Sequence, residues 1–465
     1  MTTPQPELSA ERLDELVRAA LSHAEHGASD LAWACVQPMV QAQAEQPTVA
    51  EALLHVVACD VFDRPTSATV VRAVFDAHEH EPDVVARVGG VLESVHDIRF
   101  LNDAPPSDPL YQRVGERLVE MANAVAGGDG EDEGGESVED AAKEARILRG
   151  LACVARVLGR SWDDVAEHSR LRLVALEPGR WEDHYDLGLF YKMRGRFAEG
   201  LVANRCAAAL GGDQDDAVAW NTGICATGAR EAMIAQQVWT RLGLEVELGR
   251  FGLPEGRFAQ VKVRLAERPL AERTADAEAD DPGLEESVWV ERLSPCHGVI
   301  RSALMQELGV DYGDVVLFDG APIAHHKHGD VEVPVFPHLA TLVHAGYHVF
   351  PFTGTQARKG QIADLSERLA NDAVLYVHTE QMITLCKDCW QNPELDHAHG
   401  TAEHVVVSGK LCAPPSIGPR ELLASLDAAV EAEGGVSVLV PELCRAAGES
   451  ERSDVEARRM VMLGG

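Results

Sequence analysis

Apolar residues recur at helical spacing through the first part of the chain. Near the N-terminus they fall on one face of a helix: Leu13, Leu16, Val17 and Leu21. Pro65 and Pro82 punctuate two further helical runs, and another run follows Pro109. These patterns predict a helical array over residues 1–126. Residues 127–140 hold glycines and acidic residues with almost nothing apolar, so we expect an acidic, flexible loop there.

Residues 141–249 also predict helices, and part of this region repeats with a period of about 34 residues. The three segments begin at Ile147, Trp181 and Asp216. Each segment has a small residue at its twentieth position: Ala166, Gly200 and Ala235. Each has an apolar residue near its twenty-seventh position: Leu173, Ala207 and Leu242. The first helix of the second segment contains Leu187, Gly188 and Tyr191, and Gly223 occupies the matching position in the third.

This pattern resembles the tetratricopeptide repeat (TPR) family over residues 147–249, which leaves most of the chain unmatched. The resemblance implies antiparallel helix pairs that stack into a solenoid and bind a partner protein or peptide. It also implies that residues from the first helix of each repeat line the binding groove. The residues expected there are Tyr191, Lys192, Arg194 and Asn221.

The pattern changes after residue 250. Residues 250–286 predict a strand at 258–265 followed by an acidic linker. Short runs rich in β-branched and aromatic residues follow, at 288–290, 315–318, 347–352, 374–377, 405–407 and 436–440. Helical stretches lie between some of them, at 338–345, 360–371 and 419–432. This alternation predicts an α/β domain over residues 287–465 with a mostly parallel or mixed sheet. The whole chain is therefore expected to be an α+β multidomain protein.

The α/β region also contains a candidate metal site. Cys386 and Cys389 are two residues apart, so one tight turn could present both thiolates to a zinc ion. His399 and His404 have a spacing suited to a second ligand pair, and His397 and Cys412 are further candidates. A structural zinc is one interpretation. A metal-free surface turn and a redox-active cysteine pair are the alternatives.

A second candidate cluster consists of His325, His326 and His328, in a predicted polar turn after a strand. Three imidazoles could hold a catalytic zinc with one open position, although a solvated loop is the simpler interpretation. Ser294 to Gly298 places Cys296 beside His297, but neighbouring residues on a strand face opposite ways. A bend shaped by Pro295 and Gly298 is therefore favoured over a catalytic cysteine. Three acidic residues form a loose set around a strand: Asp311, Asp314 and Asp319.

The formal net charge of −34 argues against binding to nucleic acid or to an anionic membrane surface. Ten scattered cysteines fit a reducing compartment, and no secretory signal or membrane span is visible, so we expect a cytoplasmic protein. A Gly-rich dinucleotide motif, a P-loop and a nucleophile elbow are also lacking from the sequence. The favoured hypothesis is a protein-interaction scaffold or regulator with a C-terminal domain stabilised by zinc. The alternative is a zinc-dependent, hydrolase-like enzyme whose helical half recruits the substrate.

Overall fold

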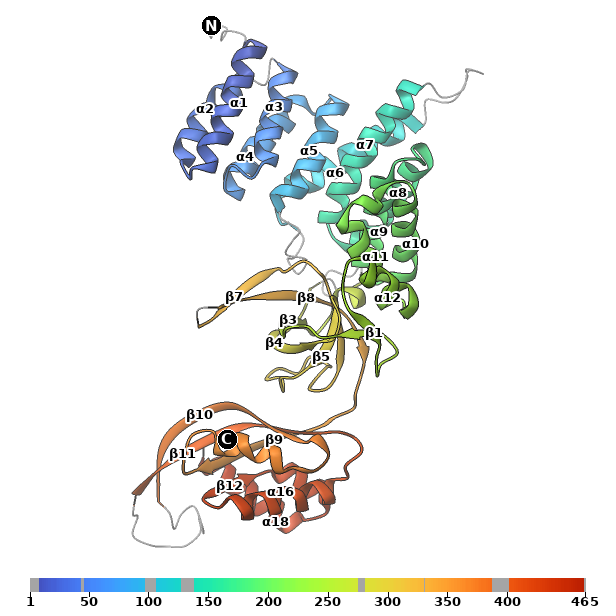
Figure 1. Cartoon of the computed structure of the whole chain (residues 1–465). Helices are drawn as coiled ribbons and strands as arrows, with labels where there is room; N and C mark the ends of the chain where they lie inside the picture. The colour runs from blue at the N-terminus through green and yellow to red at the C-terminus, as the bar shows by residue number, and fades with distance from the viewer. Residues whose placement is uncertain are drawn as a thin grey trace. The chain divides into compact units, whose positions relative to one another are not determined.

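The computed structural model describes residues 8–42, 46–96, 106–126, 138–274, 281–329, 331–386 and 401–463. The chain folds into two compact units. The first, mainly helical, comprises Met1–Leu253, Leu270–Pro282 and Ala321–Ile323. The second, rich in β-strands, comprises Pro254–Pro269, Gly283–Gly320 and Ala324–Gly465. A helical N-terminal half followed by a β-rich region with mixed sheets confirms the predicted fold class at this coarse level (Figure 1).

The helical unit begins with six helices: α1 (Ala10–Glu25), α2 (Ser29–Ala42), α3 (Pro47–Ala58), α4 (Arg64–His78), α5 (Pro82–His96) and α6 (Pro109–Ala126). Local signals fix several of their starts. Ser9 caps α1 by accepting from Arg12 N, and Asp63 caps α4 by accepting from Thr66 N. Leucine and valine side chains from all six helices form one buried core. The helices themselves confirm the helical prediction for the described part of residues 1–126.

Three helix pairs follow: α7 (Val138–Val157) with α8 (Asp163–Leu176), α9 (Trp181–Met193) with α10 (Phe197–Ala209), and α11 (Asp216–Gly228) with α12 (Ala232–Arg241). The helices α9 and α11 begin at the residues where the second and third sequence segments begin, whereas α7 starts earlier than Ile147. Glycines allow close packing within these pairs, because a Cβ on Gly188 would lie 2.4 Å from Asn204 Nδ2 and one on Gly223 would lie 2.3 Å from the Trp239 ring.

The β-rich unit contains a six-stranded sheet in the order β3-β4-β5-β6-β8-β7. Its strands are β3 (Val261–Ala266), β4 (Glu285–Arg292), β5 (His297–Ile300), β6 (Val315–Phe318), β7 (Ala324–His328) and β8 (Val331–Val343). All neighbours pair antiparallel, but β3 also pairs parallel to β8, which closes five of the strands into a ring. Apolar residues from the strands and from the connection after β5 form its core. The short strands β1 (Val246–Leu248) and β2 (Pro254–Gly256) precede this sheet in the chain.

The helix predicted for residues 338–345 is wrong. Residues 338–343 belong to β8, where His338 pairs with Phe318 and Ala340 pairs with Leu317. The apolar residues Leu339, Leu342 and Val343 have a spacing that suits a helix, but so short a run does not distinguish a helix from a strand. These residues form a strand because they pair with β6, and that pairing is not visible in the local sequence.

A second sheet in this unit has the order β10-β11-β9-β12, and all its pairs are antiparallel. It is built from β9 (His348–Gln356), β10 (Val374–Cys386), β11 (Thr401–Ala413) and β12 (Val436–Leu439), with the helices α14 (Gln361–Asp364), α16 (Pro419–Glu433), α17 (Pro441–Ala447) and α18 (Ser450–Met462). The predicted helix at 419–432 is confirmed as α16, with Pro419 at its start and Gly434 at its end. The stretch at 360–371 forms only the short α14 and two 3-10 turns.

Candidate functional site

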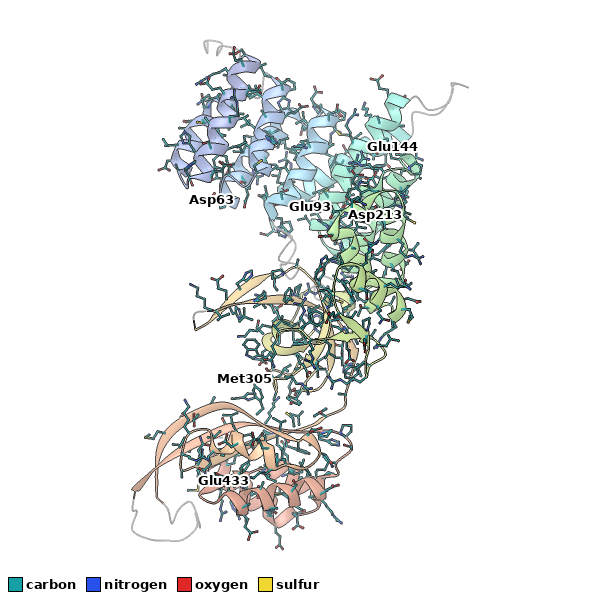
Figure 2. All side chains as sticks on the ribbon, viewed as in Figure 1. Asp63, Glu93, Glu144, Asp213, Met305 and Glu433 are labelled. Atoms are coloured by element: carbon teal, nitrogen blue, oxygen red, sulfur yellow. The ribbon has the colours of Figure 1, made fainter. Side chains whose placement is uncertain are left out.

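Four charged side chains gather where helices α5, α7, α8 and α9 meet in the helical unit. Glu93 comes from the last turn of α5 and is labelled in Figure 2. Arg156 comes from the last turn of α7, Arg170 from α8 and Asp186 from α9. These four residues are called the arginine cluster below. Arg156 forms an ion pair with Glu93, and both side chains are largely buried, at 14% and 19% exposed.

Arg170 lies deepest in the arginine cluster, with 4% of its surface exposed. Its guanidinium carbon is 5.1 Å from the centre of the Phe190 ring, and its Nη1 donates to Ala166 O over 3.2 Å in its own helix. Its Nε has no acceptor among the described residues, nor does Nε of Arg156. Desolvation, followed by the positive charge of Arg156, lowers the pKa of Arg170. Glu93 Oε1, although paired with Arg156, also makes no hydrogen bond of good geometry, so two buried donors and one buried acceptor of the cluster are unsatisfied.

Asp186 opens the arginine cluster to solvent, because this residue is exposed. Desolvation by the surrounding protein nevertheless raises the pKa of its carboxyl group, and outweighs the opposing attraction of Arg170 and Arg156. Cys153 lies near Glu93 and Arg156, and burial raises the pKa of its thiol, so the thiol is a neutral neighbour rather than a nucleophile.

The groove residues expected from the repeat pattern are placed mainly in the interior. Lys192 and Asn221 are 3% and 5% exposed, and Lys192 Nζ donates to Asn221 Oδ1 over 2.7 Å. This bond joins α9 of one pair to α11 of the next. Tyr191 is 7% exposed, and its hydroxyl donates to Glu167 Oε1 over 2.9 Å. Lys192, Asn221 and Tyr191 therefore connect helices, and their role in partner binding stays a prediction.

Arg194, the fourth expected groove residue, is also engaged within the helical unit. Its Nη2 donates to Asp163 Oδ1 over 2.6 Å, and its guanidinium carbon is 5.0 Å from the centre of the Phe190 ring. Phe190 thereby contacts two arginines, Arg194 and Arg170 of the arginine cluster. The expected partner-binding residue and the arginine cluster thus share one aromatic side chain.

The candidate zinc ligands lie mostly outside the described residues. This applies to Cys389, His397 and His399, while Cys386 and His404 are described only by their places in β10 and β11. The strand register does place Cys412, which pairs with Val374 at the opposite end of the hairpin from Cys386 and Thr401. At about 3.3 Å per residue, this separates Cys412 from Thr401 by roughly 36 Å along β11. Cys412 is fully buried and cannot share an ion with Cys386.

The second histidine cluster is not in a turn, as predicted, but in strand β7. His325 pairs with Pro334, His326 with Val333 and His328 with Val331 of β8. Successive residues of a strand point to opposite faces, so His325 and His326 do not converge on one ion. Within the described ranges, no group of three or more His, Cys, Asp or Glu residues could hold a metal.

The remaining sequence candidates have structural contacts. Ser294 Oγ lies 2.5 Å from His297 Nδ1 and accepts from the backbone N–H groups of Cys296 and His297, and all three residues are completely buried. This arrangement forms the predicted bend and offers no access to a substrate. Asp314 accepts from Ala345 N over 2.7 Å and from Asp311 N over 3.2 Å, so it serves as a turn cap.

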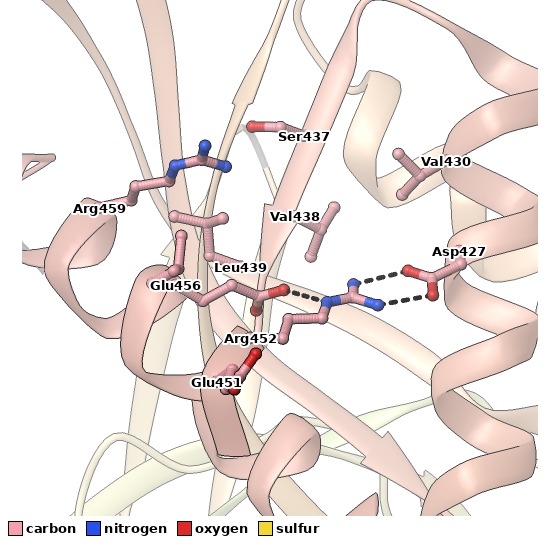
Figure 3. Close-up of a pocket in the computed structure, with 10 residues that line it drawn as sticks. Asp427, Val430, Ser437, Val438, Leu439, Glu451, Arg452, Glu456 and Arg459 are labelled. Atoms are coloured by element: carbon pink, nitrogen blue, oxygen red, sulfur yellow. Dashed lines mark hydrogen bonds and ion pairs between the residues drawn. The ribbon is translucent and has the colours of Figure 1, made fainter. Parts of the chain in front are cut away.

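A shallow pocket of about 430 Å³ lies in the C-terminal layer, between α16, β12 and α18 (Figure 3). Arg452 spans it, with Nη2 donating to Asp427 Oδ1 and Nε donating to Glu456 Oε1, each over 2.6 Å. Glu456 also accepts from the backbone N–H of Val440. The charges of Arg452, Asp427 and Glu456 satisfy one another, so these three side chains leave no unpaired charge for a ligand.

The arginine cluster was missed by sequence reasoning, although a signal was present. Arg170 stands in the buried stripe of α8 with Ala166, Ser169 and Leu173, where an apolar residue is expected. Among the described residues, no helix has the length and apolar character needed to cross a membrane.

No protein-family model matches this chain, and no curated protein is significantly similar to it.

Proposed function

We propose that this protein is an interaction protein whose helical unit binds a segment of a partner protein. The proposal treats the three helix pairs from Val138 to Arg241 as TPR-type repeats that form a solenoid. Such repeats need neighbouring helices to cover their first pair, and α5 and α6 pack there.

The observation that carries the proposal is the arginine cluster. Its members come from four helices, so the cluster is formed by packed helices rather than by one turn. Support for the proposal comes from the unsatisfied Nε groups of Arg156 and Arg170, and from Asp186, which is the exposed member of the cluster. A formal charge of −34 favours a protein partner over a nucleic acid.

Site-specific photo-crosslinking in the source cells tests this function. A photoreactive amino acid placed at residue 186 is expected to capture a defined partner. The matched control carries the same group at Ala198, which is exposed on α10 and is not part of the arginine cluster. Capture of the same proteins at both positions, or of none at 186, contradicts the proposal.

A further inference from the structure

We propose that the edge strand β12 binds an extended segment of a partner protein, which adds to the sheet as a further strand. The binding site is the pocket of about 430 Å³ between α16, β12 and α18, called the β12 pocket below (Figure 3). The pocket belongs to the β-rich unit, so this proposal is independent of the partner contact proposed for the helical unit.

The first argument is the direction of the backbone groups in β12. Among the described strands, β12 is the last of its sheet and pairs with β9 alone. The carbonyl of Ser437 points toward β9, because its oxygen would lie 2.4 Å from a Cβ on Gly354 of β9. The N–H of Val440 points the other way and donates to Glu456 Oε2 of α18 over 2.7 Å. Backbone groups of alternate residues share one side of a strand, so the N–H and carbonyl of Val438 also face away from β9.

The second argument is that these outward groups have no partner in the part of the chain that the structure describes. Val438 is 7% exposed, and neither its N–H nor its carbonyl makes a hydrogen bond there outside the sheet. A buried backbone group needs a partner, and Glu456 supplies one only at Val440. Val438 lines the β12 pocket, so a ligand in the pocket lies beside both groups. An added strand offers a carbonyl and an N–H together at the spacing that this edge requires.

The walls of the β12 pocket indicate which side chains the partner segment presents. Val438 packs on the face of the sheet that α16 covers, whereas Leu439 packs with Met460 of α18, so the edge of β12 lies between two helices. An added strand turns successive side chains to opposite faces. One side chain therefore meets Val430 of α16, and the next meets Val455 of α18, which is 37% exposed. Both contacts favour apolar side chains.

The charges around the β12 pocket favour a basic residue beside these apolar ones. Three carboxylates and two arginines line the pocket, namely Asp427, Glu451, Glu456, Arg452 and Arg459, so its lining has a net negative charge. Glu451 is exposed and forms no ion pair with another described residue. The formal charge of −34 of the whole chain acts in the same direction. The expected partner segment is therefore extended, with two adjacent apolar residues flanked by lysine or arginine.

The test uses the full chain and a synthetic peptide, acetyl-Lys-Thr-Val-Ile-Thr-Lys-amide. One control is the same peptide with methyl groups on the backbone nitrogens of its valine and isoleucine, which removes their N–H donors. A second control has glutamate in place of both lysines. Nuclear magnetic resonance with isotope-labelled valine follows the N–H of Val438, with its signal assigned from Val438→Ile. The N–H of Val440 is the internal control, because Glu456 already accepts from it.

We expect a saturable shift of the Val438 signal with the lysine peptide. N-methylation should weaken binding about tenfold, because it removes a backbone hydrogen bond. The glutamate peptide should bind more weakly than the lysine peptide, and Glu451→Gln should reduce this difference. Val455→Asn should weaken binding of the lysine peptide about tenfold through lost apolar contact. Val461→Asn is the matched control and should leave binding unchanged, because Val461 is a valine of the same helix, 72% exposed, that does not line the pocket.

Absence of a Val438 shift, or equal binding of the N-methylated peptide, overturns the proposal, and water then satisfies Val438. Equal losses in Val455→Asn and Val461→Asn also overturn it, because binding then does not depend on the pocket wall. Equal binding of the lysine and glutamate peptides contradicts the basic flank. If Val455→Asn does not fold, the comparison of the peptides decides alone, since it uses the unaltered protein. Partner capture at residue 186 tests the helical unit and is separate from all these results.

Discussion

The contact between α5 and α7 is made by backbone against backbone, and this allows a sharp test of the helical packing. A Cβ on Gly89 would lie 2.5 Å from Gly150 O and 3.0 Å from Leu118 Cδ1. In the opposite direction, a Cβ on Gly150 would lie 2.3 Å from Ala86 O. Neither clash can be relieved by turning a side chain alone, so Gly89→Ala must push the two helices apart.

The magnitude follows from two opposing terms. Overpacking a well-packed contact costs about 1–3 kcal/mol, and the rigid backbone obstacle places Gly89→Ala in the upper part of this range before compensation. Alanine is a better helix former than glycine by roughly 1 kcal/mol, which offsets part of the cost. Gly90→Ala in the same helix is the matched control, because a Cβ there meets nothing within 4 Å. Only the helix term applies, so we expect stabilisation of about 0.5–1 kcal/mol.

Urea unfolding followed by the helical circular dichroism signal compares the two variants with the parent. We expect the free energy of unfolding to fall by about 1–2 kcal/mol in Gly89→Ala and to rise in Gly90→Ala. Because both changes add one methyl group to adjacent positions of α5, their opposite signs depend only on what the methyl meets. Equal effects in the two variants would refute the close approach of α5 and α7.

Three further predictions concern other regions. Gly188→Ala should lower the free energy of unfolding by about 1–3 kcal/mol through contact with Asn204, and adding Asn204→Ala should recover part of the loss in a double-mutant cycle; additive losses would contradict the contact. The raised pKa of Asp186 means that its contribution to stability is full below the unfolded pKa and is lost as pH rises through the folded pKa. Asp186→Asn should therefore gain stability over the parent above that window in urea titrations at several pH values, and a gain that is the same at every pH would count against this. If Cys386 and Cys389 ligate zinc, protein purified without chelator should contain the metal, and changing both cysteines to serine should remove it; elemental analysis that finds equal zinc in both proteins excludes these ligands.

The helical half was predictable because its signals are local. Proline and capping residues mark where helices start, and the glycine positions within the repeat are visible in the sequence. The starts of α9 at Trp181 and α11 at Asp216 coincide with the segment boundaries for this reason. The strand β8 was missed over residues 338–343 because its state depends on pairing with β6, and a short apolar run does not contain that information.

The candidate site was harder to predict because its members are distant in sequence. Glu93 and Arg156 form an ion pair across 63 positions, and neither residue is unusual in its own helix. Arg170 was the exception, since a charge in the buried stripe of α8 has no local explanation. Conversely, the dense histidines at 325–328 attracted a functional interpretation from sequence proximity alone, and the alternation of β7 separates His325 from His326.

The arginine cluster and the glycine contact are parts of one interface, which explains how the fold can sustain buried charge. Glu93 follows Gly89 by one helical turn in α5, so it lies on the face that approaches α7. The close approach at Gly89 and Gly150 brings the carboxylate of Glu93 to Arg156 with little freedom to move away. A buried ion pair stabilises a protein only when its geometry is held in this way. Arg170 forms no such ion pair among the described residues, and it is held instead by the Ala166 carbonyl and the Phe190 ring, so its position depends on the packing that the α5 and α7 contact maintains.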